Sequence, residues 1–163
     1  MADINSDRLK QIFPVEEDLL YGRELLFFAY RDYMSEPSDI LRKYEFGPAH
    51  HRVVHFVGRK PGMTVSELLV MLKITKQSLS RVLSALVQQG YIRQETGVSD
   101  KRQRLLYLTT RGAALEAEVS APQRARFARA YSKAGPEAVA GFIRILTCLV
   151  DEKDRDRLAA YLS

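Results

Sequence analysis

Cysteine and long apolar runs are nearly absent from this sequence, and each absence excludes a class of protein. The 163 residues include a single cysteine, Cys148, so no disulfide can form within the chain. No stretch reaches the roughly 18 uncharged apolar residues that a membrane-spanning helix needs. The N-terminal segment MADINSDRLKQ has mixed charge and no apolar centre, unlike a secretory signal. We therefore expect a cytoplasmic protein without a membrane partner.

Motifs that carry catalytic chemistry are also missing. The chain has no glycine-rich phosphate loop, no Gly-x-Ser-x-Gly and no cysteine–histidine pair in a plausible order. His51 and His55 have the i, i+4 spacing that can share a metal ion, and His50 precedes them, but no third ligand is evident. We expect no enzyme, no metal site and no cofactor, and we interpret these histidines as pocket or packing residues.

Positive charge is concentrated in one part of the chain. The net charge is +5, yet the segment 73–111 alone holds eight bases and two acids, a net charge of +6. The remaining residues hold 17 bases and 18 acids, a net charge of −1. A localised basic patch is typical of a surface that binds a polyanion. A solvated face on a basic protein would give the same count, so charge alone leaves both interpretations open.

Helical periodicity predicts that most of the chain is helical, within one domain spanning 1–163. After an N-terminal arm at 1–15, the turn residues 35–39 should end the first helix, and Pro122 should kink or break the long one. The predicted helices span 16–34, 48–57, 65–72, 76–89, 110–133 and 137–162, with a short piece at 40–44.

The middle of the chain carries the sharpest local signals. Thr64 and Glu67 predict a capping box, Thr75 is a good N-cap, and Gly90 should end the helix that follows. The period then becomes extended, which predicts strands at 91–95 and 104–108 joined by a turn. Three helices followed by such a hairpin form a winged helix-turn-helix. We therefore expect a mainly α fold with a small β-hairpin wing.

The predicted helix 76–89 has one apolar face and one polar face. Recognition helices contact base edges with their N-terminal residues, where Arg can pair with guanine, Gln with adenine and Ser with either. A lysine in the first turn opposes the helix dipole, unless a phosphate lies over that end. The candidate DNA-binding residues are Lys76, Gln77, Ser78, Ser80 and Arg81. The alternative is an amphipathic surface helix with incidental bases.

The predicted hairpin tip gathers three bases around one acid. A narrow minor groove attracts an inserted arginine, and we assign Arg102 to that role. Asp100 is placed to orient its guanidinium, while Lys101 and Arg104 would neutralise flanking phosphates. The alternative is a plain solvated turn. Together the helix and the tip predict a protein that binds double-stranded DNA.

These segments resemble the multiple-antibiotic-resistance regulator (MarR) family, most sharply over 46–112. The matching pieces are Gly-Pro-Ala-His at 47–50, Thr-Val-Ser-Glu-Leu at 64–68, residues 75–90, Tyr-Ile-Arg at 91–93, Asp-Lys-Arg at 100–102 and Leu-Thr-Thr-Arg-Gly at 108–112. The resemblance implies a DNA-binding lobe at 46–112 and a homodimer whose helices at 1–35 and 113–163 interlock. It also implies a palindromic operator, a repressor, and often a small ligand that releases DNA.

Two features depart from the family pattern. Oxidant-sensing members carry a cysteine near the first helix, whereas Cys148 lies in the last one, where we interpret it as a packed thiol. His51 stands where relatives usually carry an aromatic residue. With Phe27 and Tyr30 it is a candidate ligand-binding residue, although aromatics on a first helix are more often core or dimer contacts. The alternative function is a winged-helix protein-interaction module without DNA binding.

Overall fold

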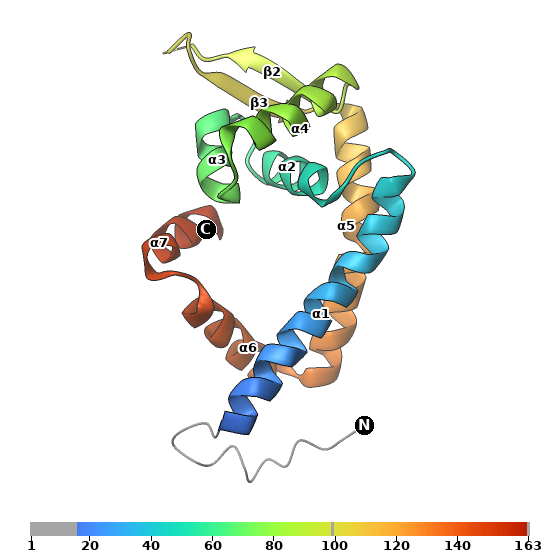
Figure 1. Ribbon diagram of the computed structural model, residues 1–163, viewed down its shortest axis with the longest axis vertical. Coiled ribbons are helices and arrows are strands. Elements are labelled where there is room, and N and C mark those ends of the chain that lie inside the picture. The colour runs from blue at the N-terminus through green and yellow to red at the C-terminus, as the bar shows by residue number, and fades with distance from the viewer. Residues whose placement is uncertain (1–15, 99, 163) are drawn as a thin grey trace. The chain divides into compact units, whose positions relative to one another are not determined.

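Seven helices and a three-stranded sheet make up the computed structural model, which describes residues 16–98 and 100–162 (Figure 1). The N-terminal arm predicted at 1–15 and Ser99 of the predicted tip lie outside these residues. In chain order the elements are α1 (Glu16–Arg42), α2 (Pro48–Arg59), β1 (Met63–Thr64), α3 (Val65–Leu72), α4 (Lys76–Gln88), β2 (Ile92–Thr96), β3 (Arg104–Leu108), α5 (Thr110–Ala134), α6 (Pro136–Leu149) and α7 (Glu152–Leu162).

The first helix is longer than the sequence predicts. The turn signal at 35–39 predicts an end near Met34, but α1 continues through Pro37 to Arg42. Proline removes one backbone donor and crowds the preceding turn. The Ser38 hydroxyl donates to the carbonyl oxygen of Met34 at 2.6 Å, which adds a hydrogen bond in the turn beside the proline. Pro37 is also buried, so its ring gains packing that offsets part of this cost.

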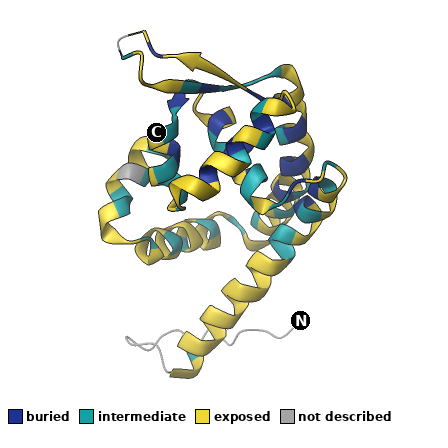
Figure 2. Cartoon of the chain, turned by 45° about the horizontal axis from the view of Figure 1, so that its top comes forward, coloured by how far each residue is buried: buried dark blue, intermediate teal, exposed yellow. Residues whose placement is uncertain are grey.

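The core of the winged region lies between α2, α3, α4 and the sheet. Buried residues are dark blue in the cartoon of Figure 2, and the fully buried side chains of this core come from every one of these elements. Burying each such aliphatic side chain stabilises the fold by about 2 kcal/mol. They include Val53, Val54 and Val57 of α2, Leu68 of α3, Leu79 and Leu86 of α4, Ile92 of β2 and Leu106 of β3.

The sheet has the strand order β1-β3-β2 and is antiparallel throughout. The predicted hairpin is confirmed: β3 has the predicted bounds, and β2 begins one residue later than predicted. The third strand, β1, is missing from the sequence prediction because two residues are too few to show alternation. It forms because Met63 pairs with Leu106 of the central strand.

Caps predicted from sequence fix the ends of α3 and α4. The Thr64 Oγ1 accepts from the Glu67 amide at 3.1 Å, and Glu67 Oε2 accepts from the Thr64 amide at 2.7 Å. The Thr75 Oγ1 accepts from the Ser78 amide at 3.1 Å. Gly90 ends the segment with a φ of +75°, which glycine adopts without strain. The predicted helix at 65–72 is thus confirmed to the residue.

The long helix α5 begins where predicted and is not broken at Pro122. The Thr109 Oγ1 caps it by accepting from the Gly112 amide at 3.1 Å. A Cβ atom at Gly112 would lie 2.0 Å from the Tyr91 carbonyl oxygen, so only glycine fits at this crossing. The start of α5 is therefore locked against the base of the wing.

The chain divides into two compact units, Met1–Gln123 and Arg124–Ser163. In the second unit the single helix predicted at 137–162 is in fact two, α6 and α7, separated by Val150 and Asp151. The Arg155 guanidinium bonds to the carbonyl oxygens of Cys148 at 3.0 Å and Val150 at 3.1 Å, which satisfies the open end of α6. The acids that open α7 were the overlooked start signal.

Cys148 is exposed, so the prediction of a packed thiol is wrong for the described chain. None of the residues of α6 is buried, although the Phe142 ring lies 6.4 Å from the Phe127 ring and 6.3 Å from the Tyr131 ring of α5. No helix among the described residues is both long and apolar enough to cross a bilayer.

Candidate nucleic-acid interface

Helix α4 presents a polar face opposite its buried one. Leu79, Leu83 and Leu86 point into the core, with exposed fractions of 1%, 5% and 0%. At 100° per residue, Gln77 and Arg81 lie on the opposite side, and both are exposed. The other predicted DNA-binding residues of this helix, Lys76, Ser78 and Ser80, are also exposed.

Ser78 has a second role that the sequence did not reveal. Its hydroxyl accepts a hydrogen bond from Thr75 Oγ1 at 2.8 Å, and its amide donates to the same threonine oxygen. Ser78 is thus part of the N-cap of α4. The first turn of this helix contains no acid, while Lys76 occupies its first position. The positive end of the helix dipole and a lysine therefore coincide, which favours an anion at this place.

The wing tip holds an arginine in a fixed direction. Asp100 Oδ1 accepts from the Arg102 amide at 2.9 Å and from Arg102 Nε at 3.3 Å. This is the contact that the sequence predicts. The Arg102 side chain is nevertheless 92% exposed, so the outer nitrogens of its guanidinium remain open to solvent. A side chain that is oriented and still solvent-exposed is suited to insertion into a groove.

Arg104 lies against the wing itself. Its Nη1 donates to the Lys101 carbonyl oxygen at 3.1 Å and to Thr96 Oγ1 at 3.3 Å. The guanidinium thus joins the two sides of the tip, a contact that sequence reasoning missed. Lys101 is exposed at the turn between them.

Two basic residues of the positively charged segment 73–111 make contacts within the protein. Arg111 stacks 4.3 Å above the Tyr91 ring and donates to the Gln89 carbonyl oxygen at 2.9 Å. Arg93 stacks 4.3 Å above the Tyr107 ring and pairs with Glu95. A charge count along the sequence cannot separate such residues from those that face solvent, so the charge available to a polyanion is smaller than +6 suggests.

The histidines of α2 connect this helix to α5. His51 is buried, and its Nε2 has no hydrogen-bond partner. Burial lowers its pKa from the ordinary value, and the neighbouring His55 lowers it further. His55 Nδ1 lies 3.3 Å from Glu116 Oε1, which also accepts from the Ser120 hydroxyl at 2.6 Å. The described residues include no group of three side chains that could hold a metal ion.

The candidate ligand residues on α1 are not gathered around His51. Phe27 and Tyr30 are 64% and 59% exposed, and neither ring contacts His51 among the described residues. They belong to an apolar surface on α1, which is exposed over most of its first half in Figure 2. This surface, termed the α1 apolar surface, comprises Leu19, Leu20, Tyr21, Leu25, Leu26, Phe27, Phe28 and Tyr30.

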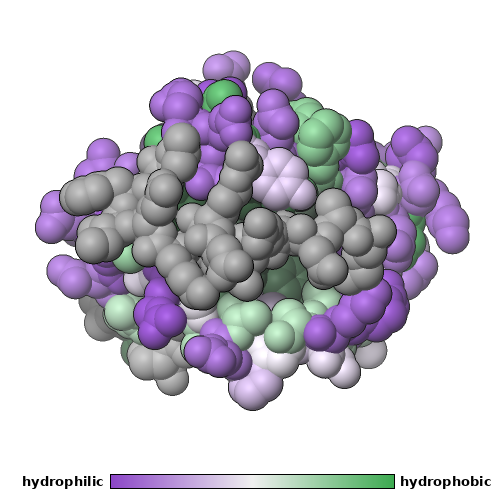
Figure 3. All heavy atoms as spheres, turned by 90° about the horizontal axis from the view of Figure 1, so that it is seen from below, coloured by the Kyte–Doolittle hydropathy of each residue, from purple (hydrophilic) through white to green (hydrophobic). Residues whose placement is uncertain are grey.

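Helix α6 of the second unit carries a separate apolar surface. Its exposed members are Phe142, Ile143, Ile145 and Leu149. Apolar residues that reach the molecular surface are visible as green spheres in Figure 3. Soluble monomers rarely leave so many large apolar side chains uncovered, so both surfaces are suited to contact another chain.

Sequence comparison relates this chain to transcriptional regulators. The sequence model of a family described as the MarR family matches residues 44–103. The HTH-type transcriptional regulator PetP of Rhodobacter capsulatus is 47% identical over 140 residues, which cover 86% of this chain and 84% of PetP.

Solved structures share the fold. Streptococcus pneumoniae FabT, crystallised in complex with DNA, has a TM-score of 0.72 at 21% identity, with 81% of this chain and 94% of FabT covered. A MarR family protein of Mycobacterium tuberculosis, in complex with p-aminosalicylic acid, has a TM-score of 0.55 at 25% identity, with 77% and 95% covered. Both confirm the winged helix-turn-helix predicted from the sequence.

Proposed function

This chain belongs to the MarR family of transcriptional regulators, and we propose that it binds double-stranded DNA as a homodimer through α4 and the wing. The observation that carries the proposal is Arg102, which Asp100 orients while its side chain stays 92% exposed. The amphipathic helix α4 supplies the second element, with polar side chains around an N-terminus that lacks acids. A helix and a wing of this kind are suited to adjacent grooves of one duplex.

The division of labour follows from side-chain chemistry. Gln77 and Arg81, opposite the buried face of α4, would read base edges in the major groove. Arg102 would enter the minor groove, whose width it can sense. Lys76, Lys101 and Arg104 would neutralise phosphates.

The homodimer is supported by the uncovered apolar surfaces. The α1 apolar surface includes Phe27 and Tyr30, which a second copy of the chain would bury. The surface on α6 would be covered in the same way. A twofold dimer requires a palindromic operator with half-sites about one helical turn apart. By covering an operator it would act as a cytoplasmic repressor.

A small-molecule effector is the last part of the proposal. The Mycobacterium tuberculosis relative was crystallised with p-aminosalicylic acid. In this chain His51 offers a buried Nε2 without a partner, which a polar group of a ligand could satisfy. We propose His51 of α2 and, on α1, Phe27 and Tyr30 as ligand contacts. No observation on the described residues favours a protein-interaction module that does not bind DNA.

Selection from a random pool of DNA duplexes tests the proposed function. We expect the retained sequences to share an inverted repeat whose half-sites lie about one helical turn apart. Retention should fall steeply between low and physiological salt. Retained DNA without an inverted repeat would contradict the proposed homodimer. If no DNA were retained in a salt-sensitive way, the proposed DNA binding itself would be contradicted.

A further inference from the structure

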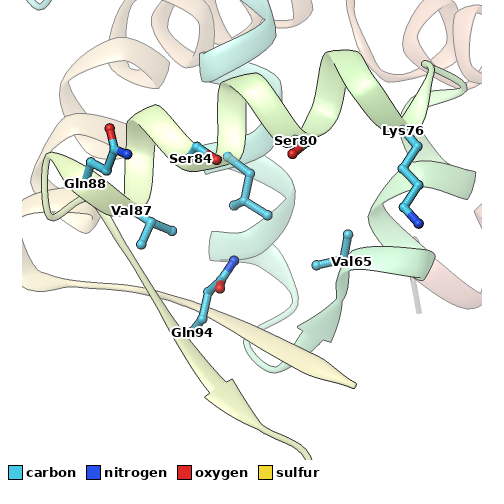
Figure 4. Close-up of a pocket in the computed structure, with 8 residues that line it drawn as sticks. Val65, Lys76, Ser80, Ser84, Val87, Gln88 and Gln94 are labelled. Carbon is cyan, nitrogen blue, oxygen red and sulfur yellow. The ribbon is translucent and has the colours of Figure 1, made fainter. Parts of the chain in front are cut away.

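An open groove of about 360 Å³ lies between α4 and strand β2 (Figure 4). Six of the residues that line it come from one flank of α4, and α3 and β2 add one residue each. They are Val65, Lys76, Ser80, Leu83, Ser84, Val87, Gln88 and Gln94. No acid is among them, so the electrostatic potential of the groove is set by Lys76 and by the amide and hydroxyl dipoles.

The polar side chains of this groove have no partner within residues 16–98 and 100–162. Among the described residues, neither Gln88 nor Gln94 makes a side-chain hydrogen bond, and the same holds for Ser80, Ser84 and Lys76. All five are exposed. Their donors are therefore available to a ligand that accepts several hydrogen bonds along a line.

Gln94 occupies a strand position where an apolar residue would be expected. It pairs with Leu106, whose side chain is fully buried, so both residues point to the face of the sheet that packs on the helices. Ile92, two residues earlier on the same face, is 2% exposed. Figure 4 shows the Gln94 side chain pointing from β2 toward α4. The alternation of the strand is thus broken by an amide where the groove opens.

The groove lies between the two DNA-reading elements. On α4 it follows the flank beside Gln77 and Arg81, and β2 leads to the tip that carries Arg102. A helix in a major groove and a wing in the adjacent minor groove are separated by one sugar–phosphate strand. Resting on the proposed function, we propose that this groove binds the phosphodiester backbone of that strand, with Gln88 and Gln94 as its hydrogen-bond donors.

The chemistry of the amide gives this contact a distinct signature. A lysine that neutralises a phosphate releases counterions, so its loss reduces the salt dependence of binding. An uncharged amide donates a hydrogen bond without releasing ions. The Gln94 contact therefore contributes affinity and fixes the position of the protein on the backbone, while the salt dependence stays unchanged.

The test measures duplex binding by fluorescence anisotropy over a salt series for Gln94→Ala and for the matched control Gln89→Ala. Gln89 is an exposed glutamine next to the C-terminus of α4 that does not line the groove. We expect Gln94→Ala to weaken binding about tenfold, since the dimer loses one hydrogen bond in each half-site. The slope against salt should stay that of the unmodified protein, as should the binding of Gln89→Ala.

A charge at the same position gives a second readout. We expect Gln94→Lys to bind more tightly and to steepen the slope by about 0.9 for each protomer. Affinity for Gln94→Ala equal to that of Gln89→Ala, or a Gln94→Lys slope equal to that of the unmodified protein, would overturn the groove assignment. If the unmodified protein itself showed no salt-sensitive binding, the proposed function would fail instead, so the two failures are distinguishable.

Discussion

At the scale of single residues, the wing tip shows how one carboxylate prepares an arginine for DNA. Asp100 holds Arg102 through its amide and its Nε, which leaves the outer face of the guanidinium exposed. The entropy of ordering this long side chain is thus partly lost before DNA arrives. Asp100 also carries a negative charge that repels phosphate. For Asp100 to favour DNA binding, the affinity gained by orienting Arg102 must exceed the affinity lost through this repulsion.

Charge repulsion and side-chain orientation predict opposite effects of an Asp100 substitution on DNA affinity. If bulk charge alone mattered, Asp100→Ala would bind DNA more tightly. We expect the variant to bind about threefold more weakly, because Arg102 is no longer oriented, and Arg102→Ala to bind at least tenfold more weakly. Anisotropy titrations measure both. Thermal melts should be unchanged, since Arg102 is exposed; tighter binding by Asp100→Ala would refute the orienting role.

The stability of the N-terminal cap of α3 depends on pH through the Glu67 carboxyl group. A hydrogen bond from Lys60 and one from the Thr64 amide lower its pKa from 4.5 to about 2. The charged form therefore stabilises the fold above pH 4.5, and this contribution is lost as the pH falls toward 2. Because the side chain is 45% exposed, solvent screens much of the interaction.

We expect Glu67→Gln to lower the free energy of unfolding by about 1 kcal/mol at pH 7, the usual cost of a lost cap. Urea titrations at pH 7 and at pH 3 measure it. The difference between the variant and the unmodified protein should shrink at the lower pH. An equal difference at both values would show that the carboxylate charge has no part in the cap.

At the scale of elements, local signals were sufficient wherever a cap or turn decides a boundary. Thr64 with Glu67, Thr75 and Gly90 predict the ends of α3 and α4 because their partners lie within a few residues. The missed features depend on distant partners. The strand β1 exists only through β3, and Arg111 is occupied by Tyr91, about twenty residues away. No sequence window contains those contacts.

The candidate site follows the same division. The side chains on α4 and the pairing of Asp100 with Arg102 could be predicted, because helical periodicity and a two-residue spacing define them. Gln94 could not, since the helix that faces it is known only from the tertiary structure. A glutamine on the inward face of a strand was the one signal available.

Gly112 is the element junction most sensitive to substitution. An added Cβ would lie 2.0 Å from the Tyr91 carbonyl oxygen, so α5 or the base of the wing must move. We expect Gly112→Ala to lower the free energy of unfolding by about 3 kcal/mol. Gly22→Ala is the control, because nothing lies within 4 Å of its added Cβ in α1; it should raise stability slightly. Equal melting temperatures for Gly112→Ala and the unmodified protein would show that the crossing is not tight.

At the scale of the whole molecule, the apolar surfaces predict the oligomeric state. Leu19 and Leu26 lie on one side of α1 and are 54% and 47% exposed. We expect the double substitution Leu19→Glu and Leu26→Glu to convert a dimer to a monomer, since four carboxylates would be buried in the interface. Sedimentation equilibrium gives the mass. Val98→Glu, on the 97% exposed Val98 of the wing loop, is the control and should stay dimeric.

Circular dichroism should show unchanged helicity in both variants, because the substituted residues are exposed in the described chain. The monomer should bind DNA far more weakly, since it can hold only one half-site. A variant that remains dimeric would place the interface away from this side of α1.

The salt dependence of operator binding shows whether a dimer holds DNA with both wings, because it counts the phosphates that both protomers neutralise. The logarithm of the association constant should fall with the logarithm of salt concentration with a slope of about −5, from three bases in each protomer. Lys101→Ala should reduce the magnitude of that slope by about 2, one lysine being lost from each wing. A slope near zero, or one unchanged by Lys101→Ala, would contradict a dimer that holds DNA with its wings.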